Sequence, residues 1–321
     1  LMVNYLSIKN LLWAVLYTVI ANVKLDMFQQ FKYWYRKYIP NKIRIFIVNS
    51  MPFWIKVRFF SLSTKNFDLS VQGHGEAQEI LKICNLLNID KGFYVDIGAA
   101  DGFNSSSTYP FAKNDNFQGL SIEFDQVKFK KMSYIYKNFL NANVLKTKVT
   151  PNNISEILTE NNVPKEFDIL NIDVDSYDLF ILKELLNSYS PKIISMEINE
   201  KIPIPLYFTV EFDENHFWKG DHFFGCSLQA AYTEIKEYNY RLHKLIYNNA
   251  IFISNETNFD FIEPTVINAY NDGYKFKEDR LSKFHYNSDV DKALSMSDDE
   301  AYKFFKKLFE NYEGLFQLKI I

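Results

Sequence analysis

Cysteine is scarce in this chain, and its scarcity excludes two classes of protein. Cys84 and Cys226 are the two cysteines among 321 residues, too few for the disulfide framework of a small secreted domain. They do not form a Cys-x-x-Cys pair, so the sequence has no cysteine-based metal motif. We therefore expect the protein to work in a reducing, cytoplasmic compartment.

Long apolar runs, a large net charge and a dinucleotide fingerprint are missing as well. Residues 11–23 are apolar except for Thr18 and Asn22, but a helix that spans a bilayer needs about 20 apolar residues. The formal net charge of −3 provides no general attraction to nucleic acid, which we do not expect as a partner. The chain also lacks Gly-x-Gly-x-x-Gly, the turn that cradles a dinucleotide pyrophosphate at a helix N-terminus.

Charge is nevertheless distributed unevenly along the chain. Residues 1–60 contain nine Lys or Arg and one acid, which gives this segment +8 and leaves −11 for residues 61–321. Apolar and aromatic residues recur at helical spacing in 11–23 and 27–38, with basic residues opposite the second stripe. We expect a helical arm over 1–60 that either lies in a membrane interface, as a peripheral contact, or packs on the domain or on a second copy in a homodimer.

After a polar boundary near 60–75, helical and strand patterns alternate. Strands are predicted at 93–97, 118–123, 143–149, 167–173, 192–198, 240–247 and 249–254; helices are predicted at 76–87, 105–114, 126–139, 153–161, 178–188 and 226–238. The last two strands are joined too tightly for a crossover, so they must be antiparallel neighbours. The alternation predicts an α/β fold: a doubly wound, Rossmann-like, mostly parallel seven-stranded sheet with a terminal antiparallel strand.

The domain organisation follows from these patterns. Residues 61–255 form the α/β domain, with an insert at 200–226 that is rich in proline, aromatic and acidic residues. Because long structured loops at the active edge of such a sheet often cover substrate, we expect the insert to do so. Residues 256–321 form an extension that ends in a helix from Asp298, whose capping box is Ser297-Asp-Asp-Glu300.

The most informative motif is the turn after the first strand of the domain. It contains Asp96, Gly98 and Gly102, and the following strand ends on Glu123. In an open α/β sheet this places a nucleoside-sized ligand at the carboxyl ends of two adjacent strands, where Glu123 can accept both ribose hydroxyls. Asp96 would repel a phosphate at the other end of the ligand. A cationic, amino-acid-bearing nucleoside fits better, which points to S-adenosylmethionine rather than NAD.

Acidic residues gather at the ends of the next two strands. Asp173 and Asp175 point the same way along an extended chain, and Glu197 ends the neighbouring strand. Clustered carboxylates repel one another unless they hold a cation, share protons or spread into solvent. Oxygen ligands from two strand ends suit Mg²⁺, Ca²⁺ or Mn²⁺, and the alternative is that these acids bind substrate hydroxyls. Asp178 has a structural interpretation, since it opens the following helix.

Three histidines are candidates for a role at this edge of the sheet. His216 and His222 lie in the insert and are the best general-base candidates, because imidazole titrates near neutrality. His222 is favoured because it follows Asp221. His74 lies between two glycines ahead of the first helix of the domain, where we expect a turn at the lip of the ligand pocket.

Together these motifs resemble the FkbM-like class I methyltransferases, which use S-adenosylmethionine. The resemblance covers 70–254 and rests on five segments: Tyr94-Val-Asp-Ile-Gly-Ala-Ala-Asp-Gly102 with Asn104, Gly119-Leu-Ser-Ile-Glu123, Ile172-Asp-Val-Asp-Ser-Tyr-Asp178, Met196-Glu-Ile-Asn199 and Phe224-Gly-Cys-Ser-Leu228. Ser176 stands where the family has glycine, and the segment from Ser70 to Glu76 matches the family's opening element only loosely.

The resemblance implies a function and a set of site residues. It implies O-methylation of a hydroxyl on a sugar, glycan or small metabolite. The cofactor-binding residues would be Gln72, Glu76, Asp96, Gly98, Ala99, Gly102, Asn104, Glu123, Phe124 and Asp173. Independently of the resemblance, the chemistry of the residues makes His222, Asp175 and His216 the catalytic candidates and Asp173, Asp175 and Glu197 the candidate metal ligands. Two alternatives remain: an NAD-dependent sugar oxidoreductase and a non-catalytic, membrane-associated binding protein.

Overall fold

A computed structural model describes residues 73–104 and 106–321 of the protein. The chain divides into two units, Leu1–Asp68 and Leu69–Ile321, and the described residues belong to the second. The helical arm predicted at 1–60 and the cofactor-binding role predicted for Gln72 lie outside the described residues. Among the described helices, none is both long enough and apolar enough to cross a membrane.

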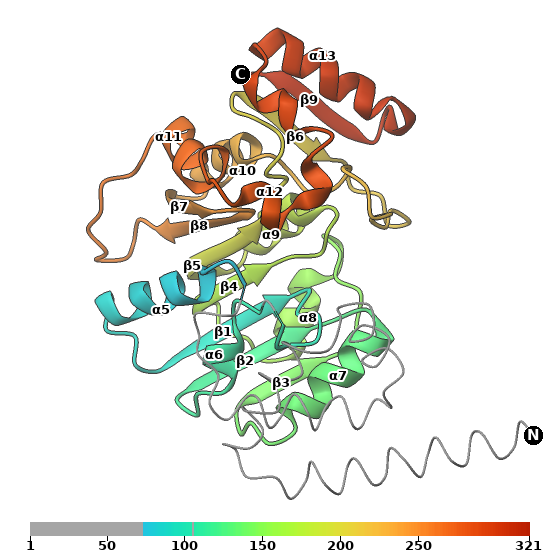
Figure 1. The fold of residues 1–321 in the computed structure, drawn as a ribbon. Helices are drawn as coiled ribbons and strands as arrows, with labels where there is room; N and C mark the ends of the chain where they lie inside the picture. Colours follow the sequence, from blue (N-terminus) through green and yellow to red (C-terminus); the bar gives the residue numbers. More distant parts are fainter. Residues whose placement is uncertain (1–72, 105) are drawn as a thin grey trace, which may run out of the picture. The chain divides into compact units, whose positions relative to one another are not determined.

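In the described part of the chain, seven strands form the main sheet (Figure 1). They are β1 (Gly92–Ile97), β2 (Phe117–Ile122), β3 (Ala142–Leu145), β4 (Glu166–Ile172), β5 (Ser190–Glu197), β7 (Tyr240–Ile246) and β8 (Asn249–Ser254). Their order is β3-β2-β1-β4-β5-β8-β7. The first five strands run parallel, whereas β8 is antiparallel to both of its neighbours, β5 and β7. The predicted mostly parallel sheet is therefore confirmed; its antiparallel strand, β8, comes last in sequence among the seven strands but lies inside the sheet.

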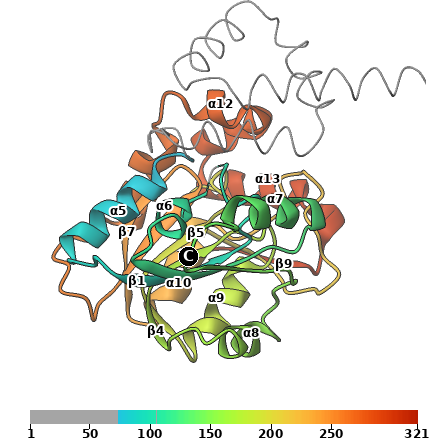
Figure 2. The same ribbon diagram turned by 90° about the horizontal axis from the view of Figure 1, so that it is seen from below.

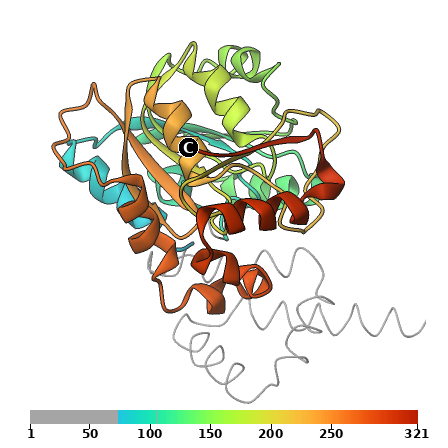
Figure 3. The same ribbon diagram turned by 90° about the horizontal axis from the view of Figure 1, so that it is seen from above.

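Helices cover both faces of this sheet, as predicted. Figure 2 shows α5 (Glu76–Leu86), α6 (Tyr109–Ala112) and α7 (Gln126–Tyr136) on one face and α8 (Ile154–Glu160) and α9 (Asp178–Leu186) on the other. The helix α10 (Leu228–Lys236) joins the second layer, which Figure 3 shows from above. Because both faces are covered, the central strands β4 and β5 are buried along most of their length, and Ile169, Leu170, Ile193 and Ile194 are all fully buried.

The insert contains a strand that we did not predict. Strand β6 (Leu206–Val210) pairs antiparallel with β9 (Phe316–Ile320), the last strand of the chain. Helix α13 (Asp298–Leu308) packs beside this pair (Figure 1), and Phe208, Phe223, Phe305 and Phe309 belong to the small apolar core they share. The capping box of Ser297 and Glu300 is present at the start of α13, as predicted. The insert and the C-terminal extension are thus joined by strand pairing.

Short helices connect β8 to α13. They are α11 (Val266–Tyr270), η2 (Asn271–Lys275), α12 (Arg280–Lys283), η3 (His285–Asn287) and η4 (Asp291–Ser295), and η5 (Glu310–Tyr312) precedes β9.

Two predicted elements are shorter than expected. The helix predicted at 105–114 is reduced to α6. Ahead of it, the Ser106 hydroxyl accepts a hydrogen bond from the Tyr109 N–H, and the Thr108 hydroxyl donates to the buried Asp96 carboxylate. The strand predicted at 143–149 ends at Leu145.

Candidate active site

A cavity of about 330 Å³ lies at the carboxyl ends of β1, β4 and β5. Its lining includes seven of the residues predicted to bind cofactor or metal: Glu76, Asp96, Gly98, Ala99, Asn104, Asp173 and Glu197. His74 also lines it, as expected for a residue at the lip of the pocket. These side chains come from four segments that are distant in sequence, and parallel strands bring their ends to one edge of the sheet.

Gly98 directly follows β1 and lies against the backbone of Asp173, the residue after β4. Its φ of +85° is a left-handed conformation, and a Cβ at this position would lie 1.7 Å from the carbonyl oxygen of Asp173. The neighbouring Asp173 N–H donates to the Ile97 carbonyl oxygen at 2.9 Å. Glycine is therefore required here both by the backbone conformation and by the close approach of β4. Gly102, by contrast, packs against Met132 and Tyr136 of α7 and is absent from the described lining of the cavity.

We expect Gly98→Ala to lower the free energy of unfolding by about 2–4 kcal/mol, the sum of left-handed strain and overpacking. Gly220→Ala is the matched control, because Gly220 has a φ of +78° but no described atom lies within 4 Å of the position that a Cβ would take there. Its cost should be the strain alone, about 1 kcal/mol. Urea denaturation measures both values, and equal losses would contradict the close approach of β4 to Gly98.

Asp96 is the most deeply buried acid of the cavity, with 1% of its surface exposed. Its two carboxylate oxygens accept hydrogen bonds from Thr108 Oγ1 at 2.5 Å and Asn171 Nδ2 at 2.9 Å. Burial raises the pKa of Asp96 to about 6, while these two hydrogen bonds oppose the rise. A carboxylate in this position gains most from a cationic partner, and the cavity is where such a partner would lie.

Glu123 follows β2 directly and is also buried. Its carboxylate accepts from the Ala100 N–H at 2.8 Å and from the Asp125 N–H at 2.5 Å, and burial raises its pKa. Ala100 lines the cavity, and Glu123 is hydrogen-bonded to Ala100, so Glu123 lies directly behind the lining. A carboxylate offers about four lone-pair positions, which leaves acceptor capacity for ligand hydroxyls. The next residue, Phe124, is 52% exposed.

The predicted acidic cluster is present. Asp173, Asp175 and Glu197 each offer an oxygen, and the three atoms lie within 4.8 Å of one another. Burial raises the pKa of all three, the charge of Asp175 adds to the rise at Asp173, and the charge of Asp173 adds to the rise at Glu197. Asp178 stands apart from them, because its carboxylate accepts from the N–H groups of Val174 and Ser176 and so shapes the turn before α9. Its structural interpretation is confirmed.

The chain brings further residues to the cavity that sequence reasoning missed. Asn248 lies in the turn between β7 and β8 and Asn249 begins β8, whereas Lys283, Phe284 and Tyr286 come from the C-terminal extension. Asn248 Nδ2 donates to Glu197 Oε1 at 2.7 Å, and the Phe284 ring packs 4.9 Å from the ring of His74. The β7–β8 turn could have been placed at this edge from strand direction alone. The sequence of the C-terminal extension has no pattern that would have placed it at this edge.

The two candidate histidines of the insert lie outside the described lining of this cavity. His222 Nε2 is 3.1 Å from Asp289 Oδ2, and the backbone oxygen of His222 accepts from Asn199 Nδ2 at 2.9 Å. His216 packs edge-on against Phe223, and burial lowers its pKa. The catalytic roles of His222, His216 and Asp175 therefore stay predictions.

Lys201 is another residue that sequence reasoning missed. Only 2% of its surface is exposed, and its Nζ lies 3.8 Å from Glu200 Oε1 and 4.1 Å from the centre of the Phe224 ring. Burial lowers the pKa of Lys201, while the charges of Glu200 and Glu197 oppose that effect. Lys201 therefore places a buried amine beside the acidic end of β5.

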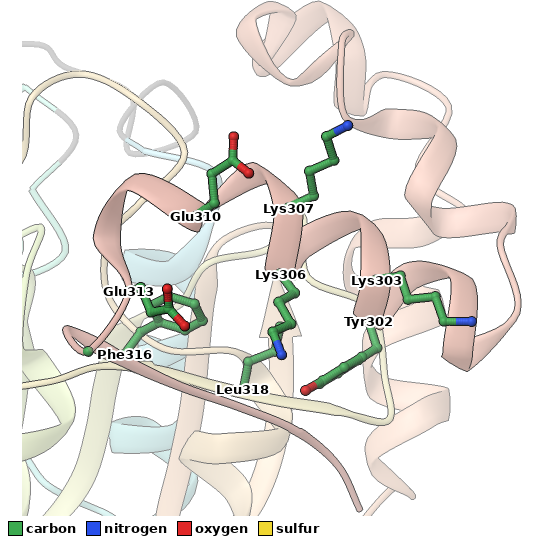
Figure 4. Close-up of a pocket in the computed structure, with 9 residues that line it drawn as sticks. Tyr302, Lys303, Lys306, Lys307, Glu310, Glu313, Phe316 and Leu318 are labelled. Carbon is green, nitrogen blue, oxygen red and sulfur yellow. The ribbon is translucent and has the colours of Figure 1, made fainter.

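A larger hollow of about 490 Å³ lies on the outer side of α13 and β9 (Figure 4). Lys303, Lys306 and Lys307 contribute to its lining, together with Glu310 and Glu313. Figure 4 shows Lys303 and Lys307 extending away from the helix. None of the predicted site residues is among the described residues that line it.

Comparisons with known proteins give only distant similarities. No family model and no curated protein matches the chain, so the resemblance to FkbM-like methyltransferases stays a prediction. Among solved structures, a putative caffeoyl-CoA O-methyltransferase from Staphylococcus aureus is 14% identical, with 67% of this chain and 98% of that chain covered and a TM-score of 0.39. A putative O-methyltransferase from Klebsiella pneumoniae is 14% identical over 71% and 99% of the two chains, with a TM-score of 0.39. A SAM-dependent methyltransferase from Aquifex aeolicus is 12% identical over 58% and 90%, with a TM-score of 0.33.

Proposed function

We propose that the protein is an S-adenosylmethionine-dependent O-methyltransferase. The observation that carries the proposal is the charge of the cavity. Its described lining contains four carboxyl groups, those of Glu76, Asp96, Asp173 and Glu197, against one ammonium group, that of Lys283. Such a site attracts a ligand with a sulfonium and an ammonium group and repels a pyrophosphate. The charge therefore favours S-adenosylmethionine over NAD.

The positions of the polar groups agree with this ligand. Asp96 would accept hydrogen bonds from the ammonium of the methionine part, which provides the buried carboxylate with a cationic partner. Glu123 would accept from the ribose hydroxyls. Gly98 lines the cavity without a side chain, so the backbone of the turn would lie against the ligand between these two acids.

Methyl transfer requires an attacking oxygen in line with the S–CH₃ bond and the removal of its proton. In the reaction the acceptor oxygen forms a bond to the methyl carbon, the S–CH₃ bond breaks, and its electron pair stays on sulfur to give S-adenosylhomocysteine. The acceptor would lie over Asp173 and Glu197, beside Asn249 and Tyr286, which would hold it in line. The hydroxyl proton would pass to a base, for which His222, Asp175 and His216 are the candidates. A sugar, glycan or small metabolite with several hydroxyls suits this polar lining.

A divalent cation is the second part of the proposal. The oxygens of Asp173, Asp175 and Glu197 lie close enough to bind Mg²⁺ or Mn²⁺ together. Such an ion would lower the pKa of a bound hydroxyl and so make it a better nucleophile. The alternative is that the three acids bind acceptor hydroxyls directly.

If the cation is required, EDTA should reduce the rate of methyl transfer by about 100-fold or more, and Mg²⁺ or Mn²⁺ should restore it. Glu197→Gln should weaken that restoration, whereas Glu237→Gln, a change at an exposed acid beyond α10, should not. A rate indifferent to chelation would remove the metal from the mechanism and leave the acids as ligands of the acceptor.

The activity itself is tested with methyl-labelled S-adenosylmethionine and a panel of sugars, glycans and small hydroxylated metabolites. Transfer of label to one class of acceptor supports the proposal. Binding of the cofactor without transfer to any acceptor would favour the non-catalytic alternative.

For residues 1–60 we propose a contact with a membrane or with a second copy in a homodimer. Co-sedimentation of the full chain with anionic vesicles supports the membrane contact. A molecular mass in solution equal to that of a dimer, without co-sedimentation, supports the homodimer contact.

A further inference from the structure

Two exposed aromatic rings face each other beside the candidate site. Phe124 follows Glu123 at the end of β2, and Phe217 lies in the insert. Each has 52% of its surface exposed, their ring centres are 6.0 Å apart, and their planes differ by only 27°. Two half-exposed phenylalanines that stack on each other form an apolar surface that the core of the domain does not explain.

Contacts from the loop after β3 hold the insert in this position. Lys148 Nζ lies 4.3 Å from the centre of the Phe217 ring and donates a hydrogen bond to the backbone oxygen of Glu214. The ring of Phe217 is thus placed by contacts of its own, although half of its surface remains in solvent.

The pair lies where a nucleoside base would extend from the cavity. Ala100 lines the cavity and donates its N–H to Glu123, the residue expected to hold the ribose. The base of a nucleoside projects from its ribose, so it would continue past Glu123 to Phe124. Neither Phe124 nor Phe217 belongs to the described lining of the cavity. The base would therefore lie beyond that lining, where these two aromatic rings can cover it.

We propose that Phe217 forms one face of the adenine site and that Phe124 forms the other. This inference rests on the proposed function, because it assigns a residue to the base of the same cofactor. An aromatic base between two rings needs about 7 Å, twice the usual contact distance of about 3.5 Å. Since the ring centres are 6.0 Å apart, the gap between the rings is no wider than that, and the insert must move outward by at least about 1 Å to admit the base. The insert would then cover the cofactor as well as the acceptor.

The test is calorimetric titration of the full chain with S-adenosylhomocysteine. Phe217→Ala should weaken binding by about tenfold or more, because the base loses one stacking partner. Phe217→Tyr keeps an aromatic face and should bind like the wild type. Phe217→Leu keeps apolar packing without an aromatic face and should also weaken binding. Phe276→Ala is the matched control, since Phe276 is 68% exposed with Lys275 near its ring, and should change nothing.

A second ligand separates stacking from hydrogen bonding. S-inosylhomocysteine lacks the exocyclic amine of adenine but keeps its aromatic faces, so Phe217→Ala should weaken its binding by the same factor. If the wild type does not bind S-adenosylhomocysteine, the proposed function itself fails. If the wild type binds it and Phe217→Ala and Phe217→Leu bind equally well, the proposed function stands and the role of Phe217 is overturned.

Discussion

Glu123→Ala is expected to weaken the binding of S-adenosylhomocysteine by at least about 100-fold. The carboxylate would accept two hydrogen bonds from the ribose, and each charge-assisted bond contributes about 1.5–3 kcal/mol. Glu123→Gln keeps one carbonyl acceptor and should give an intermediate affinity. Calorimetric titration of the three proteins measures the order.

Asp125→Ala is the matched control for this prediction. Asp125 is the next acid along the chain, and its carboxylate accepts from the N–H groups of Val127 and Lys128 at 2.8 Å as the N-cap of α7. Its loss should lower the free energy of unfolding by about 1 kcal/mol and leave the affinity unchanged. Equal affinities for the wild type and a folded Glu123→Ala protein would remove Glu123 from the cofactor site.

Asp96→Asn is expected to make the ligand-free protein more stable while it weakens cofactor binding. Burial raises the pKa of Asp96 from 3.8 to about 6, so ionisation of this carboxyl opposes folding above pH 6. The difference corresponds to about 3 kcal/mol. Asparagine avoids this cost and can still pair with Thr108 and Asn171. It cannot provide the negative charge that the ammonium of the ligand requires.

The pH dependence of the free energy of unfolding shows whether the Asp96 carboxylate stabilises or destabilises the folded protein. Between about pH 4 and pH 6 the folded protein binds more protons at Asp96 than the unfolded chain does, so this group lowers stability as the pH rises. The gain in the free energy of unfolding that Asp96→Asn provides should therefore reach its largest value above pH 6 and should disappear near pH 4. Urea denaturation at a series of pH values measures it. A variant that is less stable than the wild type at pH 7.5 would contradict the burial argument.

Sequence patterns predicted the main sheet because its signals are local. An apolar run of four to eight residues, such as Ala250-Ile-Phe-Ile253, marks a buried strand without reference to its partner. The pairing of β6 with β9 could not be predicted in this way. Its two strands lie at opposite ends of the C-terminal half, and the aromatic pattern of the insert fits a loop as well as a strand.

The candidate site was predictable to the same extent. Asp96, Gly98 and Glu197 lie at strand ends, so strand direction alone brings them to one edge. Phe284 and Tyr286 reach the cavity through a series of short helices that carry no regular apolar period. Lys201 escaped notice because a lysine at the start of a polar-looking insert suggests exposure, whereas the structure buries it.

The central claim is that the cavity binds S-adenosylmethionine, and one measurement tests it most directly. The full chain is titrated with S-adenosylhomocysteine and, separately, with NAD⁺ in a calorimeter at neutral pH. We predict saturable one-to-one binding of S-adenosylhomocysteine and no heat of binding for NAD⁺, because the cavity repels a pyrophosphate. Saturable binding of NAD⁺, or no binding of either ligand, would contradict the assignment.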